Sequence, residues 1–117
     1  MNITAAHERL LEAARTESIV YYSELITLAG IKGTSGMISG ALGRLLYSIV
    51  MAEKAKDKKA PMLSAAALPK DGNRPAAGFF ELARELGRLD STNPAVEDAF
   101  WSDELNRVYQ YWQPKDE

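Results

Sequence analysis

Apolar residues recur at helical spacing along much of the chain. Positions three and four residues apart predict a first helix from Thr4, its expected cap, to about Arg15. A long helix is predicted to begin at Thr34 or Ser35 and to fade among the lysines of residues 54–59. The last stretch predicts a helix whose apolar stripe is formed by Trp101, Leu105, Val108 and Trp112.

Cap and turn residues predict the shorter elements. Ser23 is expected to cap a helix over residues 24–28, and Gly30 to end it, because glycine tolerates the left-handed conformation of such a stop. Residues 62–68 are apolar and follow a proline, which favours a short strand. A helix is predicted over residues 79–86. Asn93 should cap another with Pro94 in its first turn, and Ser102 should start or renew the final helix.

These elements predict one mostly helical α+β domain, since a chain of 117 residues fits a single domain. Residues 4–75 are expected to form a winged helix-turn-helix-like core, with Asp71 and Gly72 in the turn of the wing. Residues 76–113 are expected to add two or three C-terminal helices to this core.

Composition excludes several kinds of chemistry. Apolar residues make up 46% of the chain and charged residues 26%, as in ordinary globular domains. There is no cysteine, which removes disulfides, thiolate nucleophiles and thiolate metal sites. No apolar run approaches the length of a membrane span, and the first residues lack the pattern of a secretory signal. We therefore expect a cytoplasmic protein without a membrane partner, a metal or a cofactor.

Charge is distributed unevenly between the two halves. The net charge is −2, but the first 60 residues carry a small excess of lysine and arginine, whereas the remainder is acidic. A nucleic-acid partner would favour the first half, and only weakly, because dedicated non-specific binders are far more basic.

The pattern of residues 19–42 is more specific than its composition. Two apolar residues, a Tyr, the sequence Ser-Glu-Leu and then Ala-Gly at residues 29–30 precede a helix rich in small residues. This order resembles the entry to the DNA-binding domain of O6-alkylguanine-DNA alkyltransferases and alkyltransferase-like proteins. Pro61-Met62-Leu63-Ser64 and the Asp71-Gly72 turn fall where that family has its Pro-Cys-His-Arg active-site strand and a following Asp-Gly turn. The resemblance covers residues 3–75.

The resemblance implies a winged-helix-like domain that binds the DNA minor groove. In the family, a tyrosine at the position of Tyr22 pushes on a phosphate, an arginine replaces a flipped base, and the cysteine accepts the alkyl group. Here Gly36 stands at the arginine position, and Met62 and Leu63 replace the cysteine and histidine. Without a thiolate there is no alkyl acceptor. The sequence therefore predicts a binding protein that is not an enzyme.

Seven polar residues are candidates for contact with nucleic acid: Tyr22, Lys32, Ser35, Ser39, Arg44, Lys70 and Arg74. The competing interpretation is a small-residue helix packed closely on a neighbour, together with ordinary turn chemistry near Asp71. The lysines of residues 54–59 are either a phosphate-tracking arm or a solvated loop.

A protein partner is the alternative to DNA. The acidic, aromatic C-terminal half suits a bacterial or phage inhibitor, immunity or antitoxin-like protein, with Tyr111 and Trp112 as the contact residues. Most other aromatic residues are expected in the core. His7 is expected at the surface, and the acidic pairs at 97–98 and 103–104 are expected in the first turns of helices.

Overall fold

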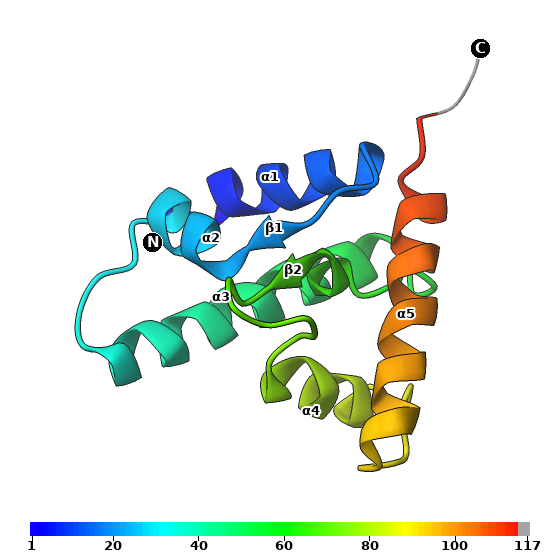
Figure 1. Ribbon diagram of the computed structural model, residues 1–117. Coiled ribbons are helices and arrows are strands. Elements are labelled where there is room, and N and C mark those ends of the chain that lie inside the picture. The colour runs from blue at the N-terminus through cyan, green and yellow to red at the C-terminus, as the bar shows by residue number, and fades with distance from the viewer. Residues whose placement is uncertain (115–117) are drawn as a thin grey trace.

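Helices surround a short central segment in the computed structural model, which describes residues 1–114 (Figure 1). The α-helices are α1 (Ile3–Arg15), α2 (Tyr22–Ala29), α3 (Ser35–Lys56), α4 (Ala77–Glu85) and α5 (Pro94–Tyr111). The remaining elements are the strands β1 (Val20–Tyr21) and β2 (Ala67–Leu68) and the 3₁₀ helix η1 (Leu63–Ala66). The predicted α+β class, mostly helical, is therefore confirmed, with 65% of the chain in helices.

The central segment spans residues 60–68, and every residue in it is buried. The prediction of a strand over residues 62–68 is mostly wrong, because η1 occupies its first part and β2 has only two residues. Four of these residues are alanines, whose small side chains allow α1, α3 and α5 to pack closely on η1. A short 3₁₀ turn thus takes the place of a longer strand at the centre of the molecule.

The two strands pair in parallel, with Val20 opposite Ala67 and Tyr21 opposite Leu68. Parallel strands need a crossover connection, and α2 and α3 supply it here. The predicted turn at Asp71 and Gly72 is confirmed, since the Gly72 N–H donates to the Pro69 carbonyl at 3.1 Å. Within residues 1–114, however, no strand follows this turn, so the described sheet is a parallel pair and not a wing hairpin.

Three predicted helix ends are confirmed by their caps. Gly30 ends α2 in the left-handed conformation, with φ of 72°. Thr34 begins α3 by accepting a hydrogen bond from the Met37 N–H, and Asn93 begins α5 with Pro94 in its first turn. These signals depend on local backbone chemistry, so they hold without knowledge of the tertiary structure.

Three other predicted helix starts are wrong. Asn2, and not Thr4, caps α1 by accepting from the Ala5 N–H at 3.1 Å. Helix α2 already begins at Tyr22, which places Ser23 inside it and leaves its start without a side-chain cap. Helix α5 is continuous through Ser102, because its apolar stripe holds both halves against the core.

Aromatic residues of α5 attach the C-terminal helices to the central segment. The Trp101 indole N–H donates to the Ala65 carbonyl at 2.9 Å, and the Tyr109 hydroxyl donates to the Ser18 carbonyl at 3.0 Å. Val108 is fully buried, and Trp101, Leu105 and Trp112 pack against the core around it. The predicted core role of this stripe is confirmed.

Two ionisable side chains are less exposed than predicted. Glu104 was expected in the first turn of a helix, but it lies in the middle of α5, where its side chain is only 1% exposed and accepts hydrogen bonds from Arg88 and from the Met62 N–H. His7 was expected at the surface but is half-buried, with its ring nitrogen 2.6 Å from a carboxylate oxygen of Glu53. In both cases a partner distant in sequence compensates for burial.

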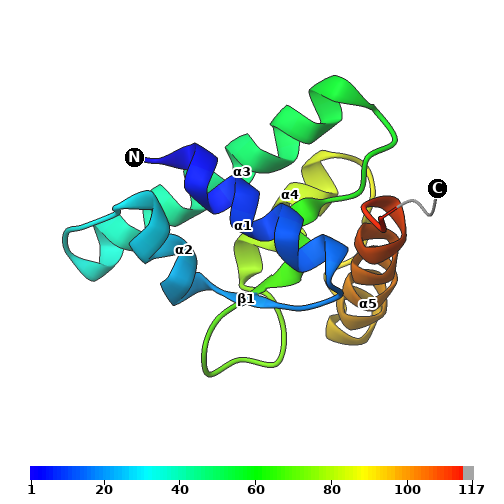
Figure 2. The ribbon, with the colours of Figure 1, turned by 90° about the horizontal axis from the view of Figure 1, so that it is seen from above.

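The first half of helix α3 projects at the end of the molecule opposite α5 (Figures 1 and 2). Helix α3 as a whole is long and apolar enough to cross a membrane by length and composition, with a mean hydropathy of 1.3 over 18 residues, contrary to the expectation that no such run exists. Only 22% of that window is buried. Its second half supplies Leu45, Ile49 and Val50 to the core, whereas its first half is mostly exposed.

Candidate functional site

The first half of α3 carries several of the candidate nucleic-acid residues on an open surface. Ser35, Ser39 and Arg44 are exposed, as is Lys32 in the preceding turn. Gly36 and Gly43 have open space where a Cβ would stand, so a neighbouring helix does not pack against them. The alternative of a small-residue helix packed closely on a neighbour is therefore wrong for this half of α3.

Tyr22 is engaged inside the protein. Its ring is half-buried, and its hydroxyl accepts a hydrogen bond from the Ala76 N–H at 3.1 Å. Burial raises the pKa of the Tyr22 phenol above its ordinary value, because the charged form would lose hydration. The side chain therefore connects the first turn of α2 to the residue that precedes α4.

A cavity of about 480 Å³ lies between α3, η1 and the start of α4. Its volume is in the range of small-ligand sites, and its walls are mostly apolar. Three groups of residues line it: Ser39, Leu42, Gly43, Leu46 and Tyr47 from α3; Ser64 from η1; and Tyr22 with residues 76–79, 81, 82 and 85 on the remaining sides.

Ser64 is the most unusual residue of this cavity. It is only 3% exposed, yet its hydroxyl has no hydrogen-bond partner. Buried polar groups are nearly always paired, since an unpaired one costs about 1–3 kcal/mol. The oxygen itself has almost no accessible surface, so a group bound in the cavity could supply the missing partner only if the Ser64 side chain turned toward it.

The start of α4 also lies at the cavity. No side chain caps this helix at Ala76, and Ala77 and Gly78 line the cavity. Backbone N–H groups at a helix start carry partial positive charge and act as hydrogen-bond donors. Glu81 and Glu85 bring carboxylates to the same cavity one and two turns along the helix. The lining therefore combines donors, hydroxyls and acceptors with an apolar body.

The two candidate residues near the Asp71 turn differ in exposure and in ion pairing. Lys70 is exposed, whereas Arg74 is half-buried and donates to Glu97 at 3.0 Å. The Arg74 Nε lies 3.1 Å from an Asp98 oxygen, without hydrogen-bond geometry, and the guanidinium stacks over the Phe80 ring at 4.8 Å. Arg74 therefore holds the loop before α4 against α5, apart from the free cations Lys32 and Arg44.

The two aromatic candidates for protein contact lie at the other end of the molecule. Tyr111 is 43% exposed, and its hydroxyl donates to Asp57 at 2.7 Å. Trp112 meets the Tyr111 ring edge-on, with 4.5 Å between the centroids, and packs against the core. Of this pair, Tyr111 offers the larger accessible surface.

Groups for catalysis are sparse at the cavity. Met62 and Leu63, the positions that the sequence resemblance matched to a cysteine and a histidine, are fully buried. Ser64 has no base hydrogen-bonded to its hydroxyl, so it lacks the activation that a serine nucleophile needs. Among the residues that the structure describes, no three histidine, cysteine or acidic side chains gather as metal ligands.

Comparison with protein-family models, curated proteins and solved structures found no match.

The sequence analysis named Tyr22 and Ser39 as candidates for contact with nucleic acid. It did not predict that they line one cavity together with Ser64 and Gly43. A serine among alanines carries no signal of its own, because its role depends on α3 and α4 closing over it. The uncapped start of α4 was the one available indication, since an alanine stands where a capping residue is usual.

Proposed function

We propose that this chain is a non-enzymatic DNA-binding module with a helix-turn-helix-like core related to the alkyltransferase-like proteins. Helix α2, the turn through Gly30 and Gly33, and α3 form the helix-turn-helix unit, and the loop around Asp71 takes the place of the wing. The exposed first half of α3 lies on the sugar-phosphate backbone, with Lys32 and Arg44 close to phosphates. This placement is supported by the exposure and small size of its side chains.

The cavity beside α3 accepts one base that has left the stack. The single observation that carries this proposal is the buried, unpaired hydroxyl of Ser64 in the cavity wall. Extruding a base costs a few kcal/mol, least for a mismatched base, and proteins offset this cost with a fitted pocket. Apolar walls suit the faces of the base, and the hydroxyls of Ser64 and Ser39 suit its edge.

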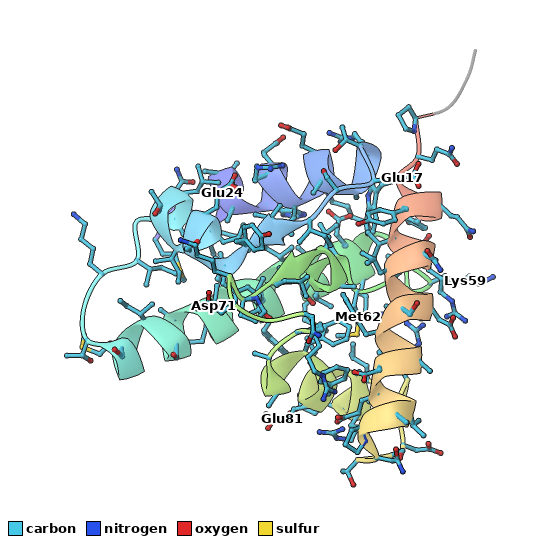
Figure 3. All side chains as sticks on the ribbon, in the orientation of Figure 1. Glu17, Glu24, Lys59, Met62, Asp71 and Glu81 are labelled. Atoms are coloured by element: carbon cyan, nitrogen blue, oxygen red, sulfur yellow. The ribbon has the colours of Figure 1, made fainter. Side chains whose placement is uncertain are left out.

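The carboxylates of Glu81 and Glu85 influence which bases fit. A carboxylate accepts hydrogen bonds from base amino and imino groups, such as the amino group of cytosine. It repels phosphates, so the DNA backbone follows the α3 side of the cavity. Glu81 lies on α4 below the central segment, away from the α2–α3 turn (Figure 3).

Few positively charged side chains on the proposed surface are available to contact phosphates. The affinity for DNA should therefore be modest and should depend only weakly on salt concentration. Contacts from Lys32, Arg44 and Lys70 predict a slope of log K against log salt of about −3, from roughly 0.9 counterions released per contact. Fluorescence anisotropy with a labelled duplex measures this slope.

Arg44→Ala tests the proposed contact surface. It should reduce the slope by about one, whereas Arg15→Ala, on an exposed turn of α1, should leave it unchanged. Equal effects of the two substitutions, or no binding at low salt, would contradict the proposal.

A further inference from the structure

A second cavity, of about 560 Å³, lies between the C-terminal end of α3 and the last turns of α5. Its lining is strongly basic and contains no carboxylate. The residues are Lys54, Lys58, Lys59, Pro61, Arg88, Arg107, Gln110 and Tyr111. Five of the fourteen basic residues of an acidic protein thus meet around one groove.

Hydrogen bonds hold the turn that presents two of these lysines. The Lys59 N–H donates to an Asp57 carboxylate oxygen at 2.9 Å, and the Ala60 N–H donates to the Asp57 carbonyl at 3.0 Å. The other Asp57 carboxylate oxygen accepts from the Tyr111 hydroxyl, which fixes the turn to α5. Lys54 donates to the Ala60 carbonyl at 3.0 Å. The groove is therefore largely formed before any ligand binds.

Charges within the groove are only partly neutralised. The Glu104 carboxylate lies behind the groove and accepts hydrogen bonds from Arg88, at 2.7 Å, and from the Met62 N–H. Burial, followed by the nearby positive charge of Arg88, lowers the pKa of Lys54. Lys58, Lys59 and Arg107 are exposed, and the Arg107 side chain is 62% accessible. An anion would supply the missing negative charge.

We propose that this groove binds a small anionic ligand that carries two or more linked phosphoryl groups. The exposed cations approach from two sides, Lys58 and Lys59 from the turn and Arg107 from α5, where its guanidinium also lies 3.9 Å from a Glu104 oxygen. One phosphoryl group can pair with each side. A single phosphate offers only one such group to the groove.

The site is separate from the cavity beside α3. In Figure 3, Lys59 lies at the α5 edge of the molecule, and Glu81 and Asp71 lie on the opposite side of α5 from it. No lining residue is shared by the two cavities. The phosphoryl-binding proposal therefore does not rest on DNA binding at α3.

The test is an NMR titration of the ¹⁵N-labelled full chain with pyrophosphate, and with orthophosphate in parallel. Pyrophosphate should shift the amides of residues 57–60 and 107–111, and it should bind at least about tenfold more tightly than orthophosphate, because two charge-assisted contacts replace one. The shifts should weaken as salt rises.

Substitutions distinguish binding of pyrophosphate in this groove from its non-specific attraction to exposed lysines elsewhere. Lys58→Gln combined with Arg107→Gln should weaken pyrophosphate binding at least about tenfold. The matched pair Lys32→Gln and Lys70→Gln, which removes two exposed cations elsewhere, should leave it unchanged. Circular dichroism checks that both proteins are folded.

Three results would overturn the proposal: equal binding of pyrophosphate and orthophosphate, equal loss in the two variant pairs, or shifts at this groove with duplex DNA and none with pyrophosphate. The first two do not bear on the affinity of the α3 surface for DNA, because the groove and that surface share no residue. The third would also count against the α3 surface as the site of DNA binding.

Discussion

The Tyr22 hydroxyl accepts a hydrogen bond from the backbone N–H of Ala76, 54 positions later in the sequence, at 3.1 Å. This bond joins the first turn of α2 to the residue before α4. Both residues line the cavity beside α3, so one contact fixes two of its walls. The shape of the cavity therefore depends on a tyrosine that the resemblance had assigned to a phosphate.

Tyr22→Phe tests the structural role of this bond. Loss of the hydroxyl should lower the free energy of unfolding by about 1 kcal/mol, since the N–H of Ala76 is near solvent and water replaces part of the interaction. Urea unfolding measures the change. Tyr21→Phe, at the exposed neighbouring ring, is the control, and equal effects would argue against the role of the bond.

Ser64→Ala should stabilise the protein and weaken its binding to DNA. Removing an unpaired buried hydroxyl should raise the free energy of unfolding by about 1 kcal/mol, because its desolvation is no longer required. The same change removes a proposed contact to the extruded base. Ser102→Ala, on the exposed face of α5, controls for the substitution. Lower stability with unchanged DNA binding would show that Ser64 is purely structural.

Glu104→Ala should destabilise the protein strongly. It leaves Arg88, whose side chain is 24% exposed, without its carboxylate and removes the acceptor of the fully buried Met62 N–H. Breaking a buried pair in this way costs about 3–5 kcal/mol. Urea unfolding measures the loss, and Glu104→Gln, which keeps an acceptor for Met62, should cost less.

The double variant Glu104→Leu with Arg88→Met should recover part of the stability lost in Glu104→Ala. Replacing both partners of a buried pair with apolar residues avoids an isolated charge. The Met62 N–H still loses its acceptor, so recovery should be incomplete. A double variant as unstable as the single one would mean that the pair is not the source of the effect.

Stability should fall in acid partly through Glu97. Hydrogen bonds from Arg84, and then from Arg74, hold the pKa of Glu97 below its ordinary value despite the opposing effect of desolvation. A lowered pKa in the folded state means that the unfolded chain binds the proton more tightly. The stabilisation is therefore complete above the ordinary glutamate pKa of about 4.3 and is lost as the pH falls through the folded pKa.

Glu97→Gln should flatten this dependence. Thermal unfolding between pH 7 and pH 3 should show a smaller loss in the variant than in the unmodified chain. The control is Glu85→Gln at an exposed position of α4. An identical acid response in all three proteins would refute the assignment to Glu97.

Local signals in the sequence predicted much of the helical framework. Gly30, Thr34 and Asn93 mark helix ends through backbone chemistry that operates within a few residues, and the structure has those ends. The parallel pairing of Val20 with Ala67 left no such signal, because two-residue strands have no measurable periodicity. The continuous α5 was missed since a serine can cap a helix or lie within one.

The candidate site was less predictable than the fold. The sequence grouped Lys32, Ser39 and Arg44 at the start of a helix as nucleic-acid candidates, and all three are exposed, but the same reasoning grouped Arg74 with them. Arg74 pairs with Glu97 and Asp98 on α5. The hydrophobic pattern of the sequence does not determine where α5 packs, so it could not predict these ion pairs. Ser64 became notable only through its burial without a partner, which is a tertiary property.

Whether the cavity beside α3 accepts an extruded base is tested most directly by the ratio of affinities for a duplex with one mismatched base and a fully paired duplex. If the cavity accepts an extruded base, the unmodified chain should favour the mismatched duplex by about tenfold or more, since that base leaves the stack at lower cost. Gly43→Leu should fill the cavity, because a Cβ at Gly43 has open space, and bring the ratio close to one while binding to the paired duplex persists.

Ala52→Leu, on the exposed side of the same helix, should leave the ratio unchanged. Entry of an extruded base into the cavity predicts selectivity for the mismatched duplex in the unmodified chain and in Ala52→Leu, and loss of that selectivity in Gly43→Leu. A ratio near one in the unmodified chain, or full selectivity in Gly43→Leu, would contradict it.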